Sequence, residues 1–168
     1  ITERFFINIA DVGIGGEVVI TKEKLPSFFS AKFNYLVSIL YVMATYRKKL
    51  VKVKTDAFSY EGKILNFVIA NGKYFGNAIG IAPHAEINDG KFSITNIGNV
   101  SLLDYFLNNG KAKKSEKINH PQVAYSEANE VYIESSDQRK VTIDMDGEFV
   151  GFAPITLICE KGKINFIK

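Results

Sequence analysis

Three carboxylates stand within five residues in the C-terminal part of the chain: Asp144, Asp146 and Glu148. A positioned carboxylate can take the proton from an attacking hydroxyl group, and a neighbouring one can hold magnesium directly or through water. The purely structural alternative is a hairpin, because Asp146 and Gly147 form a pair favoured in two-residue turns. The two interpretations are compatible, since flanking strands would fix Asp146 at the lip of a sheet. We therefore take Asp146 as a candidate general base and Glu148 as a second candidate acid.

A shorter acidic segment, Glu86 to Lys91, precedes a strand-like run. The carboxylates of Glu86 and Asp89, together with a backbone carbonyl, are the oxygen ligands that magnesium or calcium takes. The alternative is an Asx turn, in which the Asp89 side chain bonds to backbone two residues on. Both interpretations stay open at the level of the sequence.

Other kinds of site have little support. The glycines of Asn71–Gly80 recur every four residues, but no Gly-Lys-Ser/Thr of a phosphate loop follows. The two histidines, His84 and His120, lack a third nitrogen or sulfur ligand at a zinc-like spacing. The single cysteine, Cys159, excludes an internal disulfide framework, and no Gly-x-Ser-x-Gly elbow is present. These absences favour neither a zinc protein nor a nucleophilic hydrolase.

Two groups of basic residues could meet an anionic surface. One is Arg47-Lys48-Lys49, and the other lies among residues 110–119. Solvated loops are the simpler explanation, but each such cation near anionic lipid is worth about 1 kcal/mol. The net charge of +3 is too small to predict nucleic-acid binding.

The chain has 168 residues, which is the size of one ordinary domain. The helices and strands of this domain must position the residues named above. The longest charge-free apolar stretch, residues 33–46, has 14 residues, whereas a membrane-spanning helix needs roughly 20. We predict no transmembrane helix and no signal peptide, and a reducing, cytoplasmic location. The first residue is Ile1, so we expect the chain to be a piece of something longer.

Periodicity predicts mainly strands. Apolar residues recur at helical spacing over residues 28–46, with Ser27 as a plausible cap, and residues 100–107 are a second helix candidate. We expect residues 110–119 to form a loop. The expected strands are residues 4–10, broken by Gly13, Gly15 and Gly16, and residues 49–56, 63–70, 91–97, 130–134, 139–145, 154–159 and 163–167. Turns are expected at Glu61-Gly62, Asp89-Gly90, Asp146-Gly147 and Lys161-Gly162. This order favours a mainly β (α+β) fold, an antiparallel β-sandwich with two or more accessory helices.

Five segments, in this order, resemble the C-terminal domain of the diacylglycerol kinase, sphingosine kinase and YegS-like bacterial lipid kinase family. They are Arg4-Phe-Phe-Ile-Asn-Ile-Ala10 with Gly13, the run Val68-Ile-Ala-Asn-Gly-Lys-Tyr-Phe-Gly76, Ile81-Ala-Pro-His-Ala85 with Asp89-Gly-Lys-Phe92, His120-Pro-x-Val123, and Ile143-Asp-Met-Asp-Gly-Glu148. Tyr35 on the predicted helix is similar to a recurrent tyrosine of the family. The likeness covers essentially the whole chain, residues 1–168.

The resemblance implies a β-sandwich in which Asp146 is the base for a lipid hydroxyl and Glu148 supports the magnesium network. It implies a structural metal site at Glu86, Asp89 and the Lys91 carbonyl, where Glu86 replaces the more usual Asp. Where the family usually has three glycines after the aromatic residue, this chain has Gly76-Asn77-Ala78.

ATP in this family sits on an N-terminal domain with a Gly-Gly-Asp-Gly-Thr motif, which these residues lack. We therefore expect an ATP- and Mg2+-dependent lipid kinase whose nucleotide-binding domain is absent from this chain, so that the fragment alone is inactive. The expected partners are a diacylglycerol-like lipid, the parent's nucleotide-binding domain and the membrane surface. We expect the protein to attach to the membrane peripherally. A homodimer through an exposed edge strand stays open. The alternatives are a non-catalytic lipid-binding module with the same fold, and an unrelated sandwich that binds sugar or protein.

Overall fold

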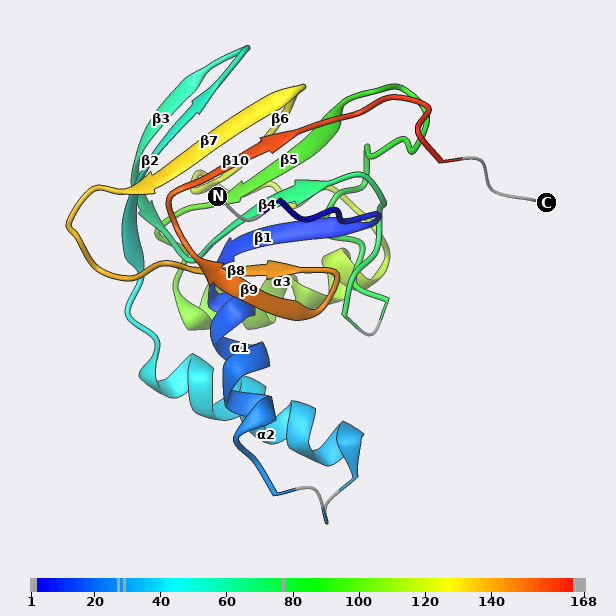
Figure 1. Ribbon diagram of the computed structural model, residues 1–168. Helices are drawn as coiled ribbons and strands as arrows, with labels where there is room; N and C mark the ends of the chain where they lie inside the picture. Colours follow the sequence, from blue (N-terminus) through cyan, green and yellow to red (C-terminus); the bar gives the residue numbers. More distant parts are fainter. Residues whose placement is uncertain (1–2, 27, 29, 77, 165–168) are drawn as a thin grey trace.

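The computed structural model describes residues 3–26, 28, 30–76 and 78–164, and it consists of two antiparallel sheets with three helices (Figure 1). The larger sheet has the order β6-β5-β4-β1-β8-β9, and the smaller one has the order β10-β7-β2-β3. The strands of the larger sheet are β1 (Ile9–Gly13), β4 (Asn66–Ala70), β5 (Phe92–Ile97), β6 (Val123–Ala128), β8 (Thr142–Met145) and β9 (Glu148–Phe152). Those of the smaller sheet are β2 (Lys49–Thr55), β3 (Ser59–Ile64), β7 (Glu130–Ser135) and β10 (Ile155–Ile158). The expected β-sandwich with accessory helices is confirmed.

The alternation of side chains divides the apolar residues between two cores. In β1, Ala10 and Val12 point toward the smaller sheet and pack with Val51 and Val53 of β2. Residues one step away point to the opposite face, because successive side chains of a strand alternate. There Ile9 belongs to a second core cluster, which includes Val68, Ala70, Ile81, Ala82, Ala85, Ile97 and Val100. This second face carries the site described below.

The helices are α1 (Ile14–Glu23), α2 (Ala31–Thr45) and α3 (Leu102–Lys113). Figure 1 shows α1 and α2 together at one end of the molecule, below the sheets. Within the described residues, no helix combines the length and the apolar character needed to cross a bilayer. Ser30 caps α2 by accepting a hydrogen bond from the backbone N–H of Phe33, so the helix begins later than predicted. The predicted cap, Ser27, lies outside the described residues.

The N-terminal strand ends at Gly13, as expected, but helix α1, which contains Gly15 and Gly16, was not predicted. Their lack of a side chain serves close packing: a Cβ at Gly16 would lie 2.8 Å from the Thr142 Cβ atom. The N-terminal strand is also displaced, since it starts at Ile9.

The expected single strand over residues 63–70 is wrong as well. The chain leaves the smaller sheet after Ile64 and enters the larger one at Asn66. Leu65 lies between them and donates its N–H to the Ile97 and Gly98 carbonyls. The predicted turn at Glu61-Gly62 falls inside β3.

Other elements differ from the expectation too, and the expected strand over residues 139–145 begins only at Thr142. Helix α3 extends to Lys113 and therefore includes the first part of the expected loop at residues 110–119, where Ala112 is buried. Strand β6 was not predicted, because its side chains are only partly buried and give weak alternation. The segment expected as the last strand is not a strand at residues 163–164, and the remainder lies outside the described residues.

Candidate active site

A cavity of about 870 Å³ lies between the helix-facing side of the larger sheet and the helices. Its walls are mainly apolar and come from β1, α1 and α2, for example Ile9, Val18, Ile39 and Met43. One part of the lining is polar, and its members are Asn8, Asp11, Asn66, Asp144, Asp146 and Gly147. An apolar cavity with a few convergent polar groups is the usual form of a small-molecule site.

Asp146 occupies the β8–β9 turn, as the Asp-Gly pair predicts. Asp146 and Gly147 both have positive φ, 52° and 87°, as a type I′ turn requires. The Asp146 carboxylate accepts three backbone hydrogen bonds: Oδ2 from Ile7 N (2.7 Å), and Oδ1 from Asn8 N (3.0 Å) and Ile9 N (2.9 Å). These bonds fix the carboxylate against the start of β1. A carboxylate has about four lone-pair sites, so Oδ2 keeps room for a further donor.

Two more carboxylates meet beside it. Asp11 and Asp144 are direct partners in the register of β1 and β8, and both line the cavity. Asp11 is only 2% exposed and Asp144 9%. Burial raises the pKa of Asp11 well above its ordinary value, and the negative charge of Asp144 raises it further, against hydrogen bonds from Asn66 and Gly16.

The pKa of Asp144 is raised to about 6, first by burial and then by the charges of Asp146 and Glu148. A hydrogen bond of 2.8 Å from the Gly147 N–H to Asp144 Oδ1 acts in the opposite direction. Because two buried like charges repel, at least one of these facing carboxyls is favoured in its protonated form near neutral pH.

Glu148 lies apart from this group. It pairs with Met145 across the β8–β9 hairpin, and Met145 belongs to the core between the sheets. Paired residues share a face of the sheet, so Glu148 is on the face opposite to Asp144. Its side chain is exposed and does not line the cavity. The structure therefore brings Asp144, rather than Glu148, onto the cavity side together with Asp146.

The loop before β5 forms the Asx turn that the sequence allowed. Asp89 Oδ1 accepts a hydrogen bond of 2.9 Å from the Lys91 N–H. The Lys91 ammonium is also 3.1 Å from Glu127 Oε2, and this hydrogen bond raises the pKa of Lys91, with a smaller contribution from the charge of Asp89. Glu86 is exposed. Carboxylate and carbonyl oxygens of this loop fit magnesium by type, although no cluster of three or more acidic, His or Cys side chains occurs among the described residues.

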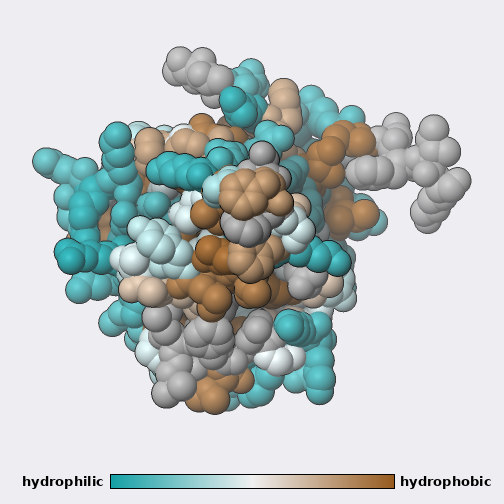
Figure 2. All heavy atoms as spheres, turned by 90° about the horizontal axis from the view of Figure 1, so that it is seen from below, coloured by the Kyte–Doolittle hydropathy of each residue, from teal (hydrophilic) through white to brown (hydrophobic). Residues whose placement is uncertain are grey.

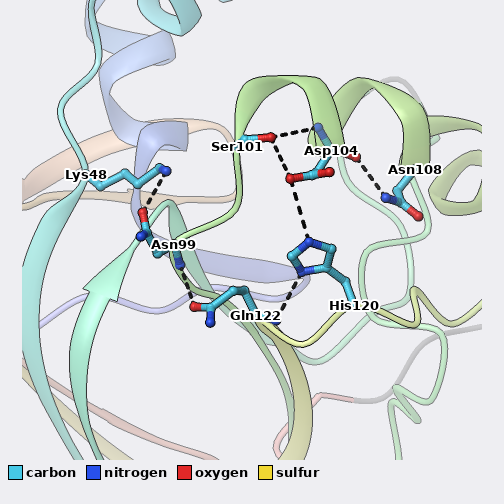
Figure 3. A network of polar contacts seen from close by, with 7 residues as sticks. All are labelled: Lys48, Asn99, Ser101, Asp104, Asn108, His120 and Gln122. Atoms are coloured by element: carbon cyan, nitrogen blue, oxygen red, sulfur yellow. Dashed lines mark hydrogen bonds and ion pairs between the residues drawn. The ribbon is translucent and has the colours of Figure 1, made fainter.

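A second polar network closes another side of the cavity (Figure 3). His120 Nε2 lies 3.7 Å from Asp104 Oδ2, and His120 Nδ1 accepts a hydrogen bond from the Gln122 N–H. The hydroxyl of Ser101 donates to the same Asp104 oxygen at 2.5 Å and lowers the pKa of Asp104, with a smaller contribution from His120. The network ties the start of α3 to the loop before β6. This arrangement gives His120 a structural role.

The glycine-rich loop after β4 touches the site from the other side. Asn71 and Gly72 donate their N–H groups to the Asn8 carbonyl, and the Asn8 side chain donates to the Tyr74 carbonyl. The loop thereby holds the same segment that binds Asp146. A Cβ at Gly76 would lie 2.8 Å from the Tyr35 hydroxyl, which lines the cavity. Asn77 lies outside the described residues, and Ala78 adopts a φ of 62° that glycine usually supplies.

Sequence reasoning missed Asp11 and gave Asp144 no role of its own. The available signal was a charged residue inside an apolar run, since Asp11 stands between Ala10 and Val12. A buried ionisable residue in a strand is uncommon without a partner or function. Its pairing with Asp144 could not be predicted, because the two residues belong to strands that are far apart in the sequence.

Fold and site together define a two-sheet domain that has a mainly apolar cavity with a carboxylate in a tight turn beside it. The model of the YegS C-terminal NAD kinase beta sandwich-like domain matches residues 10–168. The chain therefore belongs to this family, and the resemblance read from the sequence is confirmed.

Relatives with curated names agree with this assignment. The diacylglycerol kinase of Staphylococcus carnosus is 28% identical over 163 residues, covering 96% of this chain and 52% of that protein. That of Bacillus subtilis is 25% identical over 154 residues, covering 90% of this chain and 49% of that protein. The chain spans about half the length of the curated relatives that it matches.

Solved structures show the same fold. A crystal structure from Bacillus anthracis str. Sterne superimposes with a TM-score of 0.68 at 21% identity, covering 94% of this chain and 50% of that one. A second, of a diacylglycerol kinase from the same organism, gives a TM-score of 0.54 at 17% identity.

Proposed function

We propose that this chain is the lipid-binding, catalytic-base part of an ATP- and magnesium-dependent lipid kinase that phosphorylates the hydroxyl group of a diacylglycerol-like lipid. The observation that carries the proposal is the position of Asp146, whose carboxylate is held beside an apolar cavity of about 870 Å³. Relatives named diacylglycerol kinase support it. The acyl chains would lie along the apolar wall that α2 contributes.

In this proposal the lipid hydroxyl oxygen attacks the γ-phosphorus of ATP, and the bond between that phosphorus and ADP breaks. The hydroxyl proton passes to Asp146, most simply to Oδ2, which accepts one backbone N–H where Oδ1 accepts two. Since phosphoryl transfer depends mainly on positioning and charge stabilisation, one fixed base suffices on the lipid side. Magnesium would supply charge stabilisation for the phosphates. Glu148, on the opposite face of the sheet from Asp144, would support it only through its negative charge.

Glu86, Asp89 and the Lys91 carbonyl would hold a structural magnesium ion away from the reacting atoms. We further propose that the nucleotide site is supplied by a part of the parent protein outside these 168 residues, so that this chain alone transfers no phosphate. The membrane surface, on the cytoplasmic side, is the proposed source of the lipid.

Transfer of radiolabelled phosphate from ATP to diacylglycerol in mixed micelles tests the proposal. The full-length parent should be active, Asp146→Asn should lower its rate by about 100-fold or more, and the 168-residue chain should be inactive. Asparagine tolerates the positive φ of this position, which makes the exchange a matched one. Normal activity of the Asp146→Asn parent would remove Asp146 as the base, and activity of the chain alone would refute the missing nucleotide site.

A non-catalytic lipid-binding module is the second candidate. It is favoured by the three backbone N–H groups on Asp146, which give this carboxylate a sufficient structural reason to be present. A wild-type parent that binds diacylglycerol but phosphorylates neither it, nor sphingosine, nor a polyprenol would establish this alternative.

A further inference from the structure

Helix α2 exposes several large apolar side chains. Leu36, Leu40 and Tyr41 are 54%, 53% and 60% exposed. Phe33, one turn earlier, and Phe28, just before the helix, are exposed too. Figure 2 looks onto this end of the molecule and shows apolar side chains gathered near its centre, with hydrophilic ones around them. Such a continuous patch is costly in water and marks an interaction surface.

The segment that carries the patch contains cations and no acidic residue. Between Glu23 and Asp56 the sequence contains no acidic residue, whereas it contains seven Lys or Arg residues. Of these, Lys24, Lys32 and Arg47 are exposed and flank α2 at its two ends. Lys48 and Lys49 are already engaged, by Asn99 and Glu17. An apolar helix face bordered by cations complements a bilayer with anionic headgroups.

The same helix forms part of the cavity wall. Tyr35, Ile39 and Met43 line the cavity, while Leu40 and Tyr41 do not. Lys32 and Leu36 line the cavity and are also exposed, so they lie at its rim. A bilayer in contact with the exposed face of α2 would therefore be separated from the apolar cavity by this one helix. A lipid would need to move only around α2 to enter the cavity.

We propose that the outer face of α2, defined as Phe28, Phe33, Leu36, Leu40 and Tyr41 with its border of Lys24, Lys32 and Arg47, docks on an anionic lipid bilayer. The docked helix lies in the interface and presents the cavity to the membrane. This inference rests on the proposed function only in assuming that the cavity receives its lipid from a bilayer.

Co-sedimentation of the chain with vesicles tests the docking without any enzymatic readout. Vesicles of equimolar phosphatidylglycerol and phosphatidylcholine should bind the chain, and phosphatidylcholine alone should bind it far less. Leu40→Gln with Tyr41→Gln should weaken binding by at least about 10-fold, since two large apolar groups no longer enter the bilayer. Lys24→Gln with Arg47→Gln should weaken binding to the anionic vesicles by about 30-fold.

The matched control is Ile87→Gln with Ile158→Gln, which removes two exposed apolar side chains outside α2. This variant should bind like the unmodified chain, and circular dichroism should show all variants folded. Absence of binding to anionic vesicles, or equal losses in the control and the α2 variant, would overturn the proposal. So would a dimer in solution that Leu40→Gln with Tyr41→Gln dissociates without vesicle binding, since the occupant would then be a second copy.

Kinase assays of the full-length parent separate this inference from the proposed function. With a short-chain, water-soluble diacylglycerol, the Leu40→Gln, Tyr41→Gln parent should keep its activity. With long-chain diacylglycerol in anionic vesicles, the activity of the same variant should fall about 10-fold, in line with its weaker binding to the vesicles. Vesicle binding by a parent that phosphorylates no lipid would refute the proposed function and leave the docking surface standing.

Discussion

Asp11 and Asp144 face each other across β1 and β8, and the pair lies on the side of the sheet that borders the cavity. Asp11 belongs to β1, and Asp144 stands near the end of β8, two residues before Asp146. Together with Asp146 they place three carboxylates around one polar corner of a mainly apolar cavity. In the proposed reaction, the lipid headgroup lies at this corner, where Asp146 can reach its hydroxyl.

The raised pKa values of this pair predict that the chain becomes more stable on mild acidification. A carboxyl whose pKa is higher in the folded than in the unfolded chain binds its proton more tightly when folded, so protonation favours folding. The pKa of Asp144 is about 6 in the folded chain, and that of Asp11 is also raised. The free energy of unfolding should rise by about 1 to 2 kcal/mol between about pH 7.5 and about pH 5, after allowance for solvent screening.

Urea unfolding at a series of pH values measures this effect. Asp144→Asn should be more stable than the unmodified chain at the upper end of the range and should show a flatter profile. The carboxyls with lowered pKa values, Asp56, Asp104 and Asp137, lose their contribution only at lower pH and do not affect this window. A profile that falls on acidification from pH 7.5 would contradict the assignment.

The three hydrogen bonds to Asp146 predict a structural cost that is separate from catalysis. Asp146→Gly keeps the positive φ of the turn and removes only the carboxylate. The backbone N–H groups of residues 7–9 then lose a charged acceptor, and the free energy of unfolding should fall by about 2 kcal/mol. Chemical unfolding provides the value, and amide exchange at Asn8 and Ile9 should accelerate. If stability and exchange are unchanged, the carboxylate does not hold this segment.

The close contact between α1 and β8 predicts opposite effects for two helical glycines. An alanine at Gly16 would bring its Cβ within 2.8 Å of the Thr142 Cβ and 3.2 Å of the Ile143 backbone nitrogen. Overpacking of this kind should lower the free energy of unfolding by about 2 kcal/mol. Gly110 in α3 has no atom within 4 Å of such a Cβ, so Gly110→Ala should raise it by about 0.5 kcal/mol, through helix propensity. Thermal unfolding of both variants compares them directly, and equal effects would argue against the tight α1–β8 packing.

Magnesium should stabilise the chain if the loop at Glu86, Asp89 and Lys91 holds the ion. At a magnesium concentration about ten times Kd, linkage gives about 1.4 kcal/mol. Asp89→Asn keeps an oxygen for the hydrogen bond from the Lys91 N–H and removes only the charge, so it should abolish most of the gain. Glu61→Gln on β3 serves as the control and should respond like the unmodified chain. A gain that persists in Asp89→Asn would place the ion elsewhere.

Local residue preferences were enough for the features confined to a few neighbours. The Asp146-Gly147 turn follows from the tolerance of both residues for positive φ, and the buried Val51 and Val53 alternate with exposed Lys52 and Lys54 as predicted. The order of five short segments was enough for the family. The sandwich class followed from the number of strands and the turns between them.

Features that depend on residues far apart in the sequence could not be predicted from it. Gly15 and Gly16 look like a break in the sequence, but in the fold they let α1 approach Asp11 and Thr142. The apolar run over residues 63–70 gives no sign that the chain changes sheets at Leu65, because both halves are buried.

Which carboxylates belong to the site also depends on the tertiary structure. Asp146 and Glu148 stand two residues apart and read as a pair, yet the β8–β9 register puts Glu148 on the far face of the sheet. Asp11, far away in the sequence, becomes the direct neighbour of Asp144. The sequence by itself therefore determined the turn, the candidate base and the family, because these depend on short-range conformational preferences and motif order. The tertiary structure alone decided which carboxylates share the cavity, since a side chain's face depends on strand register, which the packing of the whole sheet sets.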